Sequence, residues 1–208
     1  MPLVFTVAAV LTLLLANEWW WRRSSVHGEL GRKFVHITVG TFVAFWPYYL
    51  SWNQIRFMSV AFLLVVGLSK YFNIFRAIHS VTRPTLGELY FGLAVGLTTF
   101  VTDRPALYAA ALLQMSLADG LAAVIGVRFG RGNGYRVLGA LKSLAGSGTF
   151  LLTSYVILLS LSVFSTHLAI PYCLGIAVAA AVLENVGLRG LDNLLVPLFV
   201  AGMLRLLV

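Results

Sequence analysis

The chain is a succession of long apolar runs separated by short polar loops, and this pattern predicts membrane-spanning helices. A helix needs about 20 predominantly apolar residues to cross the hydrocarbon core of a bilayer. The apolar runs cover residues 3–21, 34–50, 54–70, 88–101, 106–127, 144–164, 168–184 and 191–207. The run at 88–101 is short, so we expect it to extend back towards Pro84, to be tilted or to be re-entrant. We therefore predict an all-α, polytopic integral membrane protein whose transmembrane helices, about eight in number, form a single bundle.

The composition agrees with this pattern and leaves no room for a separate soluble domain. Of the 208 residues, 60% are hydrophobic and only 11% are charged, whereas about a quarter of the residues in soluble domains are charged. Residues 1–208 are therefore predicted to form one membrane domain. The first run ends in Trp19-Trp20-Trp21-Arg22-Arg23, which is typical of a retained interfacial anchor and not of a cleaved signal peptide. The single cysteine, Cys173, excludes an internal disulfide and a thiolate metal cluster.

Basic residues are distributed unevenly between the two predicted sides of the membrane. If the loop at 22–33 is cytoplasmic, alternation of the runs places twelve of the fifteen basic residues on that side. These are Arg22, Arg23, Arg32, Lys33, Lys70, Arg76, Arg83, Arg128, Arg131, Arg136, Lys142 and Arg189. Such a positive-inside bias predicts a multi-pass cell-membrane protein with both termini outside. The net charge of +8 then reflects orientation in the membrane, and we expect no nucleic-acid partner.

Asp119 is the one charged residue in the run at 106–127. A carboxylate inside a membrane span costs several kcal/mol unless it is paired, bound to a metal or exposed to a wet cavity, so it indicates a functional site. At 1.5 Å per residue it lies about 12 Å from the cytoplasmic end of the run. At helical spacing it shares a face of small residues with Gly126 and Gly130, which a bulky anionic group could approach.

Two basic motifs lie at the same predicted face. In Arg32-Lys33-Phe34-Val35-His36 the two cations and the histidine can share one surface at the start of a helix, where they oppose the helix dipole and are plausible anion ligands. The alternative is that these cations only set the orientation of the chain in the membrane and contact lipid headgroups. The second motif, Lys142-Ser143-Leu144-Ala145-Gly146-Ser147, offers a phosphate site made of a lysine and backbone N–H groups. A glycine-rich helix start, with a lysine that extends its charged end to the membrane surface, explains this motif as well as a phosphate site does.

Three further carboxylates lie at the cytoplasmic ends of other runs, and they are Glu88, Glu184 and Asp192. The pairs Glu184-Asn185 and Asp192-Asn193 flank a tight turn between two runs, and oxygen ligands of this kind suit Mg²⁺. Helix capping accounts for Glu88, Asp192 or Asn193, but not for Glu184 at the C-terminal end of a helix. Together with the basic motifs, the four carboxylates indicate phosphoryl or nucleotidyl transfer to a substrate dissolved in the membrane.

The motifs resemble one known family. They are Gly31-Arg32-Lys33-Phe34-Val35-His36, Gly87-Glu88, Ala118-Asp119-Gly120-Leu121-Ala122 continuing to Gly126 and Gly130, Lys142-Ser143 with Gly146-Ser147, and Glu184-Asn185 with Asp192-Asn193. In this order they resemble the dolichol kinase, phytol kinase and yeast-type diacylglycerol kinase family, over residues 29–200. Residues 1–28 form an additional N-terminal span and loop. The chain resembles the compact prokaryotic members.

The resemblance implies a CTP-dependent kinase that phosphorylates the hydroxyl of a membrane lipid alcohol, with Mg²⁺ as the metal and an active site at the cytoplasmic face. A polyprenol or dolichol is the expected acceptor, and phytol or diacylglycerol is possible. Catalytic roles are expected for Asp119, Lys142 and Glu88, and metal binding for Asp119, Glu184 and Asp192. The expected nucleotide-binding residues are Arg32, Lys33, His36, Gly126, Arg128, Gly130, Ser143, Gly146, Ser147, Asn185 and Asn193. Either Asp119 or Glu88 would orient or deprotonate the lipid hydroxyl.

Two other functions remain open from the residues alone. A phosphatidate cytidylyltransferase would also use CTP at a membrane face, and it would release pyrophosphate where a kinase releases CDP. An ion-coupled transporter would use Asp119 and Glu184 to carry protons or cations. Transporters are expected to distribute acids across the bilayer and often contain inverted repeats. In this chain the acids gather at one face and no repeat is found.

Overall fold

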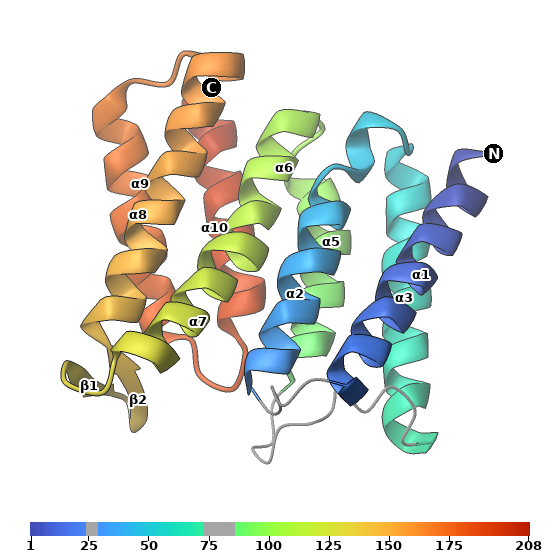
Figure 1. Cartoon of the computed structure of the whole chain (residues 1–208). Helices are drawn as coiled ribbons and strands as arrows, with labels where there is room; N and C mark the ends of the chain where they lie inside the picture. The colour runs from blue at the N-terminus through green and yellow to red at the C-terminus, as the bar shows by residue number, and fades with distance from the viewer. Residues whose placement is uncertain (24–28, 73–85) are drawn as a thin grey trace.

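The described part of the chain is a set of helices that run side by side between two ends of the molecule (Figure 1). The computed structural model describes residues 1–23, 29–72 and 86–208. The helices are α1 (Pro2–Arg23), α2 (Glu29–Ala44), α3 (Trp52–Phe72), α5 (Gly87–Val101), α6 (Pro105–Leu113), α7 (Asp119–Phe129), α8 (Leu144–Leu161), α9 (Ile170–Val186) and α10 (Asp192–Leu207). Both chain termini lie at one end, and a hairpin of strands β1 (Gly134–Val137) and β2 (Ala140–Ser143) lies at the other.

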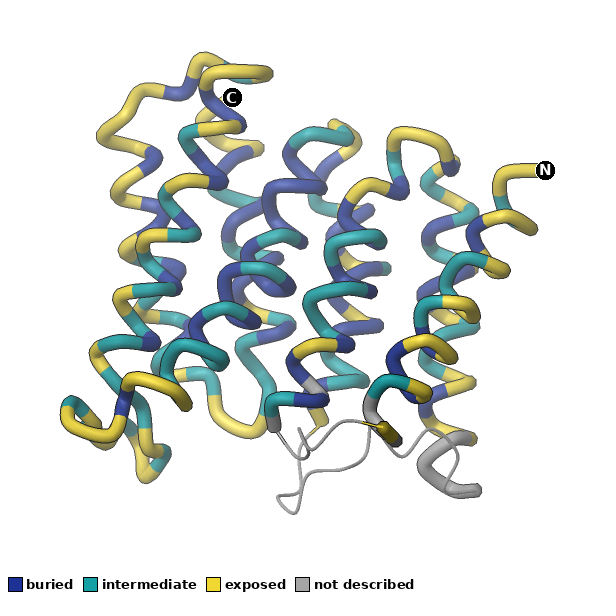
Figure 2. Tube along the Cα trace, viewed as in Figure 1, coloured by how far each residue is buried: buried dark blue, intermediate teal, exposed yellow. Residues whose placement is uncertain are grey.

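Each predicted apolar run falls on a helical segment. Within the described residues, three helical segments are long and apolar enough to cross a membrane, and they are Pro2–Trp20, Pro105–Phe129 and Leu144–Thr166. Shorter apolar helices cover Trp52–Leu68, Gly87–Val101 and Ile170–Val186. The outward faces of the helices are exposed along much of their length (Figure 2), and they carry large apolar side chains such as Phe57 and Leu152. Because such a surface suits lipid and not water, the chain is a helical membrane protein.

Two apolar cores hold the helices together. One is formed around α6, α8, α9 and α10, with Phe150 and Leu158 of α8 and Val200 of α10 fully buried. The other joins α2, α3, α5 and α6, and Tyr108 of α6 is fully buried in it. The Tyr108 hydroxyl donates to the carbonyl of Val95 at 3.1 Å, so its one polar group is satisfied. The segment containing α6 contributes to both cores and therefore fixes the position of Asp119 at its far end.

The β1–β2 hairpin departs from the predicted all-α fold. The two strands pair in antiparallel register, with Val137 opposite Ala140 and Gly134 opposite Ser143. The two intervening residues, Leu138 and Gly139, have φ values of 48° and 82°. Positive φ at both positions is the geometry of a two-residue type I′ turn, which matches the twist of paired strands. The hairpin brings Lys142 back over the end of the bundle.

A π-helical turn, η2 (Gln114–Ala118), interrupts the segment that the sequence predicted as one regular helix. It joins α6 to α7 directly before Asp119. The helix α2 packs against this region closely, because Ser116 lies against Gly40 and Ile37 lies against Gly120 with no room for a further side chain. Insertions of this kind are often found at functional sites. Here the close packing sets Lys33 and His36 of α2 beside the start of α7.

Candidate active site

Three carboxylates from three helices meet near the hairpin end of the bundle. Asp119 begins α7, Glu184 lies in the last turn of α9 and Asp192 begins α10. One oxygen of each can be chosen so that all three lie within 4.8 Å of one another. Asp119 and Glu184 are buried, and Asp192 is half-buried. We call these three residues the carboxylate cluster.

The turn between α9 and α10 depends on a glycine. A Cβ atom at Gly187 would lie 2.8 Å from the backbone nitrogen of Asp192 and 2.9 Å from its Cα atom. Because real Cβ atoms do not approach other atoms this closely, only glycine lets the chain turn back at this point. The tight turn is what places Asp192 near Glu184.

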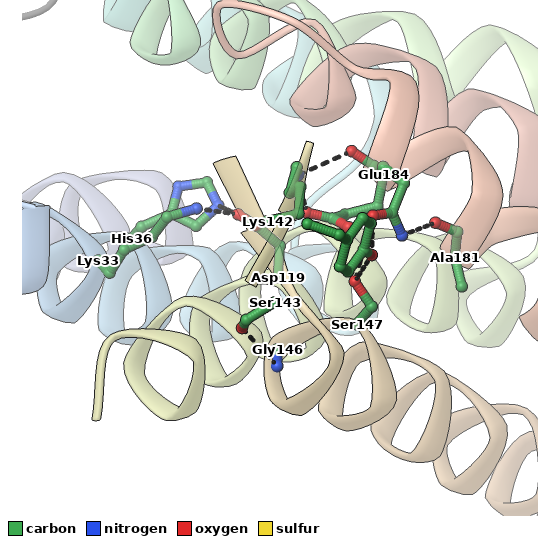
Figure 3. Close-up of polar contacts among 11 residues, drawn as sticks. Lys33, His36, Asp119, Lys142, Ser143, Gly146, Ser147, Ala181 and Glu184 are labelled. Carbon is green, nitrogen blue, oxygen red and sulfur yellow. Dashed lines mark hydrogen bonds and ion pairs between the residues drawn. The ribbon is translucent and has the colours of Figure 1, made fainter. Parts of the chain in front are cut away.

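Lys33 and His36 approach the cluster from α2. Lys33 is buried and its ammonium group forms an ion pair with Asp119 (Figure 3). His36 Nε2 lies 2.8 Å from the carbonyl oxygen of Met115 in the π-helical turn and 3.6 Å from Asp119 Oδ2. A carbonyl oxygen can only accept a hydrogen bond, so Nε2 of His36 carries a hydrogen and donates it. This hydrogen bond holds the imidazole ring beside the Asp119 carboxylate.

Lys142 approaches the cluster from the hairpin. Its ammonium group pairs with the Glu184 carboxylate and also lies 3.1 Å from the Glu184 carbonyl oxygen (Figure 3). Burial acts to lower the pKa of Lys142, but Glu184 and, less strongly, Asp192 and Asp119 act to raise it, and the net result is a raised pKa. Lys142 is therefore fully protonated at neutral pH.

The charges in this region leave a negative excess. Among the side chains that the structure describes, the three carboxylates face two lysines, so their charges sum to −1 with His36 neutral. Asp192 forms no salt bridge with any residue in the described ranges, while the two lysines each engage one oxygen of Asp119 or Glu184. A buried negative excess is costly unless a cation neutralises it. The donor set of oxygens and the negative excess among the described side chains both fit a bound divalent cation.

A second polar group lies beside the cluster and includes a residue that sequence reasoning missed. The Tyr135 hydroxyl of β1 lies 2.5 Å from Ser147 Oγ and 2.5 Å from Asn185 Oδ1. Ser147 donates to the same Asn185 oxygen at 3.2 Å, and the Asn185 amide donates to the Ala181 carbonyl at 2.9 Å. The one sequence signal for Tyr135 is the strand-like alternation of polar and apolar residues in Gly134-Tyr135-Arg136-Val137, which precedes a turn containing glycine. The group ties the hairpin to α8 and α9.

The small-residue face of α7 is covered by the chain itself, which differs from the expected approach of a bulky ligand. A Cβ atom at Gly130 would lie 2.7 Å from Ser143 Cβ, and one at Gly146 would lie 3.0 Å from the Ala122 carbonyl oxygen. Ser143 is the N-cap of α8 and accepts a hydrogen bond from the Gly146 amide at 3.1 Å. Gly126, at the centre of this contact, faces Ser143 and Gly146. The small residues therefore allow α8 to begin directly against α7.

Comparison with known proteins identifies the family. The chain is 35% identical over 202 residues to the phytol kinase of Synechocystis sp., an alignment that covers 92% of this chain and 83% of the relative. It is 30% identical over 221 residues to a Triticum aestivum protein named "Probable phytol kinase, chloroplastic", covering 94% and 73% respectively. The chain belongs to the phytol kinase family. No protein-family model and no solved structure matches it.

Membership of the phytol kinase family makes the chain a kinase, that is, a phosphotransferase with an alcohol as acceptor. Within the described residues of this chain, the carboxylate cluster and its two lysines have a chemistry that suits phosphoryl transfer. Cytidylyl transfer and ion-coupled transport, which the residues alone left open, are not the activities of these named relatives.

The other residues of this chain that were predicted to belong to the site lie outside the carboxylate cluster. Asn193 is buried and its amide donates to the Gly87 carbonyl at 3.0 Å, so it ties α10 to the start of α5, where Glu88 lies half-buried. Arg128 is exposed at the end of α7, with its guanidinium 5.5 Å from the ring centroid of Phe129, and it forms no ion pair within the described part of the chain. Some predicted residues lie outside the part of the chain that the structure describes. They are Arg76, Arg83 and Pro84, together with the side chains of Arg22, Arg32 and Lys70.

Proposed function

We propose that this chain transfers the γ-phosphoryl group of CTP to the hydroxyl of a phytol-type isoprenoid alcohol, with Mg²⁺ as the metal. The observation that carries the proposal is the meeting of Asp119, Glu184 and Asp192 with Lys33 and Lys142 at one end of a membrane bundle. Phosphoryl transfer depends on positioning the reactants and on neutralising phosphate charge. The carboxylates can hold a metal ion that does both, and the two lysines supply positive charge.

Asp119, Glu184 and Asp192 would hold the metal. Mg²⁺ is usually bound through one or two carboxylates together with substrate phosphates. The fit rests on the negative excess of the cluster and on the oxygens that Lys33 and Lys142 leave unpaired. When bound, Mg²⁺ neutralises the developing charge on the β- and γ-phosphates and orients them.

The nucleotide would lie between the hairpin and the start of α8. Lys142 offers a fully charged ammonium, and the first N–H groups of α8 favour an anion at its N-terminus. The hydroxyl and amide groups of Tyr135, Ser147 and Asn185 lie beside it and offer hydrogen bonds to a sugar or base. CTP as the donor rests on the family resemblance of the motifs.

The acceptor proposed here is narrower than the one expected from the sequence. The motifs favoured a polyprenol or dolichol first and phytol second, whereas the named relatives are phytol kinases. In the transfer, the alcohol oxygen forms a bond to the γ-phosphorus and the bond from that phosphorus to the β–γ bridging oxygen breaks. CDP leaves, and the hydroxyl proton passes to a carboxylate, either Asp119 or Glu88.

The proposed orientation places this site at the cytoplasmic face. The eight predicted runs would then all cross the membrane, with both termini outside. The positive-inside bias of the loops supports this arrangement. So does the position of both termini at the end of the bundle away from the hairpin (Figure 1).

Product analysis of the purified full chain tests the proposal. CTP or ATP labelled at the γ-phosphate is supplied with phytol, a polyprenol or diacylglycerol in lipid nanodiscs, with and without a Mg²⁺ chelator. We expect labelled phytyl phosphate and CDP from CTP, with loss of product when Mg²⁺ is removed. Release of pyrophosphate, or no phosphorylation of any alcohol, would overturn it.

A further inference from the structure

Two adjoining pockets follow one side of α2, between α1, α3 and α5. The space between atoms in the outer pocket is about 460 Å³ and in the inner pocket about 280 Å³, and both figures include space that is open to the surroundings. Val39, Phe62 and Phe91 line both pockets, so the two pockets adjoin one another along α2. We call the two pockets together the apolar track.

The apolar track is polar at one end only. Its outer end includes His36 and Glu88. The inner pocket contains one hydroxyl, that of Ser59, which donates to the Gly92 carbonyl at 2.7 Å and is therefore already satisfied. The buried ring of Trp46 lines the inner pocket. Such a lining suits a ligand with a single polar head and a long hydrocarbon tail.

The polar end of the track adjoins the carboxylate cluster. His36 lines the outer pocket, and its Nε2 atom is 3.6 Å from Asp119 Oδ2. The start of α5 is fixed against the α9–α10 turn by two hydrogen bonds, from the Asn193 amide to the Gly87 carbonyl at 3.0 Å and from the Leu86 amide to the Arg189 carbonyl at 3.2 Å. A head group at this end therefore lies next to the carboxylate cluster, which is proposed to hold the metal.

Glu88 has the properties of a group that receives a hydroxyl proton. It is half-buried, it lines the outer pocket, and it makes no hydrogen bond or salt bridge within the described ranges 1–23, 29–72 and 86–208. Asp119 differs, because its carboxylate is paired with Lys33 and lies in the cluster proposed to hold the metal. The two carboxylates that sequence reasoning could not separate are thus placed in different surroundings.

We propose that the apolar track binds the isoprenoid tail of the acceptor alcohol and holds its hydroxyl between His36 and Glu88, with Glu88 taking the proton. This inference rests on the function proposed above and adds the acceptor site to it. From Val35 to Ala44, its last residue, the helix α2 rises about 14 Å at 1.5 Å per residue, a length that covers the greater part of a phytol-sized tail. The tail of a longer polyprenol has to pass Trp46 and continue into the bilayer.

Photo-crosslinking locates the tail without relying on turnover. The full chain in nanodiscs is irradiated with a phytol analogue that carries a diazirine at the end of its tail, and labelled peptides are identified by mass spectrometry. We expect labels near Trp46 and Met58, and we expect unlabelled phytol to compete with them. A saturated acyl chain with the same diazirine distinguishes the isoprenoid tail from any bilayer hydrocarbon chain. Equal labelling by both, or labelling of α8 and α9 instead, overturns the inference.

A matched pair of variants adds a kinetic test. Val39→Phe fills the track, whereas Val60→Phe adds the same ring on the exposed side of α3. We expect Val39→Phe to raise KM for phytol about tenfold or more, with KM for CTP unchanged, and Val60→Phe to change neither. Glu88→Gln should lower kcat about 100-fold or more while the labelling pattern persists. Unchanged KM in Val39→Phe, or unchanged kcat in Glu88→Gln, contradicts the assignment.

The crosslinking result and the product assay separate the two proposals. If phytol is phosphorylated but the label lies elsewhere, the acceptor site is wrong and the proposed function stands. If the track is labelled and competed but phytol is not phosphorylated, the track binds the lipid and the proposed activity is wrong. Absence of both labelling and phosphorylation overturns both.

Discussion

A buried ion pair joins Lys33 of α2 to Asp119 at the start of α7, 86 residues further along the chain. Removal of one partner leaves an uncompensated charge in the interior, which typically costs about 3–5 kcal/mol. We therefore expect Lys33→Met to lower the thermal unfolding midpoint in detergent. The double variant Lys33→Met/Asp119→Leu should recover part of this loss, because no unpaired charge remains. A double variant as unstable as the sum of the two single changes would show that the pair is not coupled.

Asp192 should affect metal binding more than stability, because it forms no salt bridge with any described residue. Asp192→Asn is expected to raise the Mg²⁺ concentration for half-maximal activity roughly 10–100-fold, in line with losses seen when groups around a metal are altered. Asp103→Asn, at an exposed position outside the cluster, is the matched control and should leave this concentration unchanged. An unchanged Mg²⁺ dependence in Asp192→Asn would remove Asp192 from the metal site.

Gly187 should be needed for activity although it offers no side chain. A Cβ atom there would lie within 3 Å of Asp192, so Gly187→Ala has to displace the start of α10. The control Gly175→Ala lies within α9, the helix that Gly187 follows, and no atom lies within 4 Å of the added carbon. We expect a large loss of kcat in Gly187→Ala and near-normal kcat in Gly175→Ala. Equal activity of the two variants would argue against a role for the tight turn.

The positions of the helices and the gathering of the acids could be predicted from the sequence. The apolar runs are long enough to identify the helices, and the uneven loop charges place Asp119, Glu184 and Asp192 at one end. The pairing of each lysine with a particular acid could not be predicted. Lys33 and Lys142 pair with Asp119 and Glu184 across 86 and 42 residues, and their expected role in neutralising nucleotide phosphates stays a prediction. The first pair is set by the packing of α2 against α7 and the second by the fold of the β1–β2 hairpin over α9, and a local sequence pattern records neither.

Two local features were also missed, for physical reasons. The π-helical turn at Gln114–Ala118 has an ordinary helical composition, and the insertion becomes evident only from its packing against α2. The β1–β2 hairpin is short and lies in a loop, where four residues of alternation are a weak signal. Because the hairpin was not expected, neither was the role of Tyr135 in linking Ser147 and Asn185.

The Tyr135 hydroxyl gives a test of the nucleotide side of the site. Tyr135→Phe removes the group that bridges Ser147 and Asn185 and leaves the ring in place. The loss of hydrogen bonds worth about 0.5–1.5 kcal/mol each should raise KM for CTP roughly threefold to tenfold, with KM for phytol unchanged. Tyr172→Phe, at an exposed position near the start of α9, is the control. A change in KM for phytol alone would contradict the placement of the nucleotide beside the hairpin.

The most direct test of the central claim is phosphoryl transfer from γ-labelled CTP to phytol by Asp119→Asn, measured beside the wild-type chain. Asparagine keeps the shape of the side chain and removes the charge on which both Lys33 and the proposed metal depend. We predict that formation of phytyl phosphate falls at least about 100-fold per folded molecule, with folding checked by size-exclusion chromatography. Full activity in folded Asp119→Asn would contradict the assignment of the carboxylate cluster as the active site.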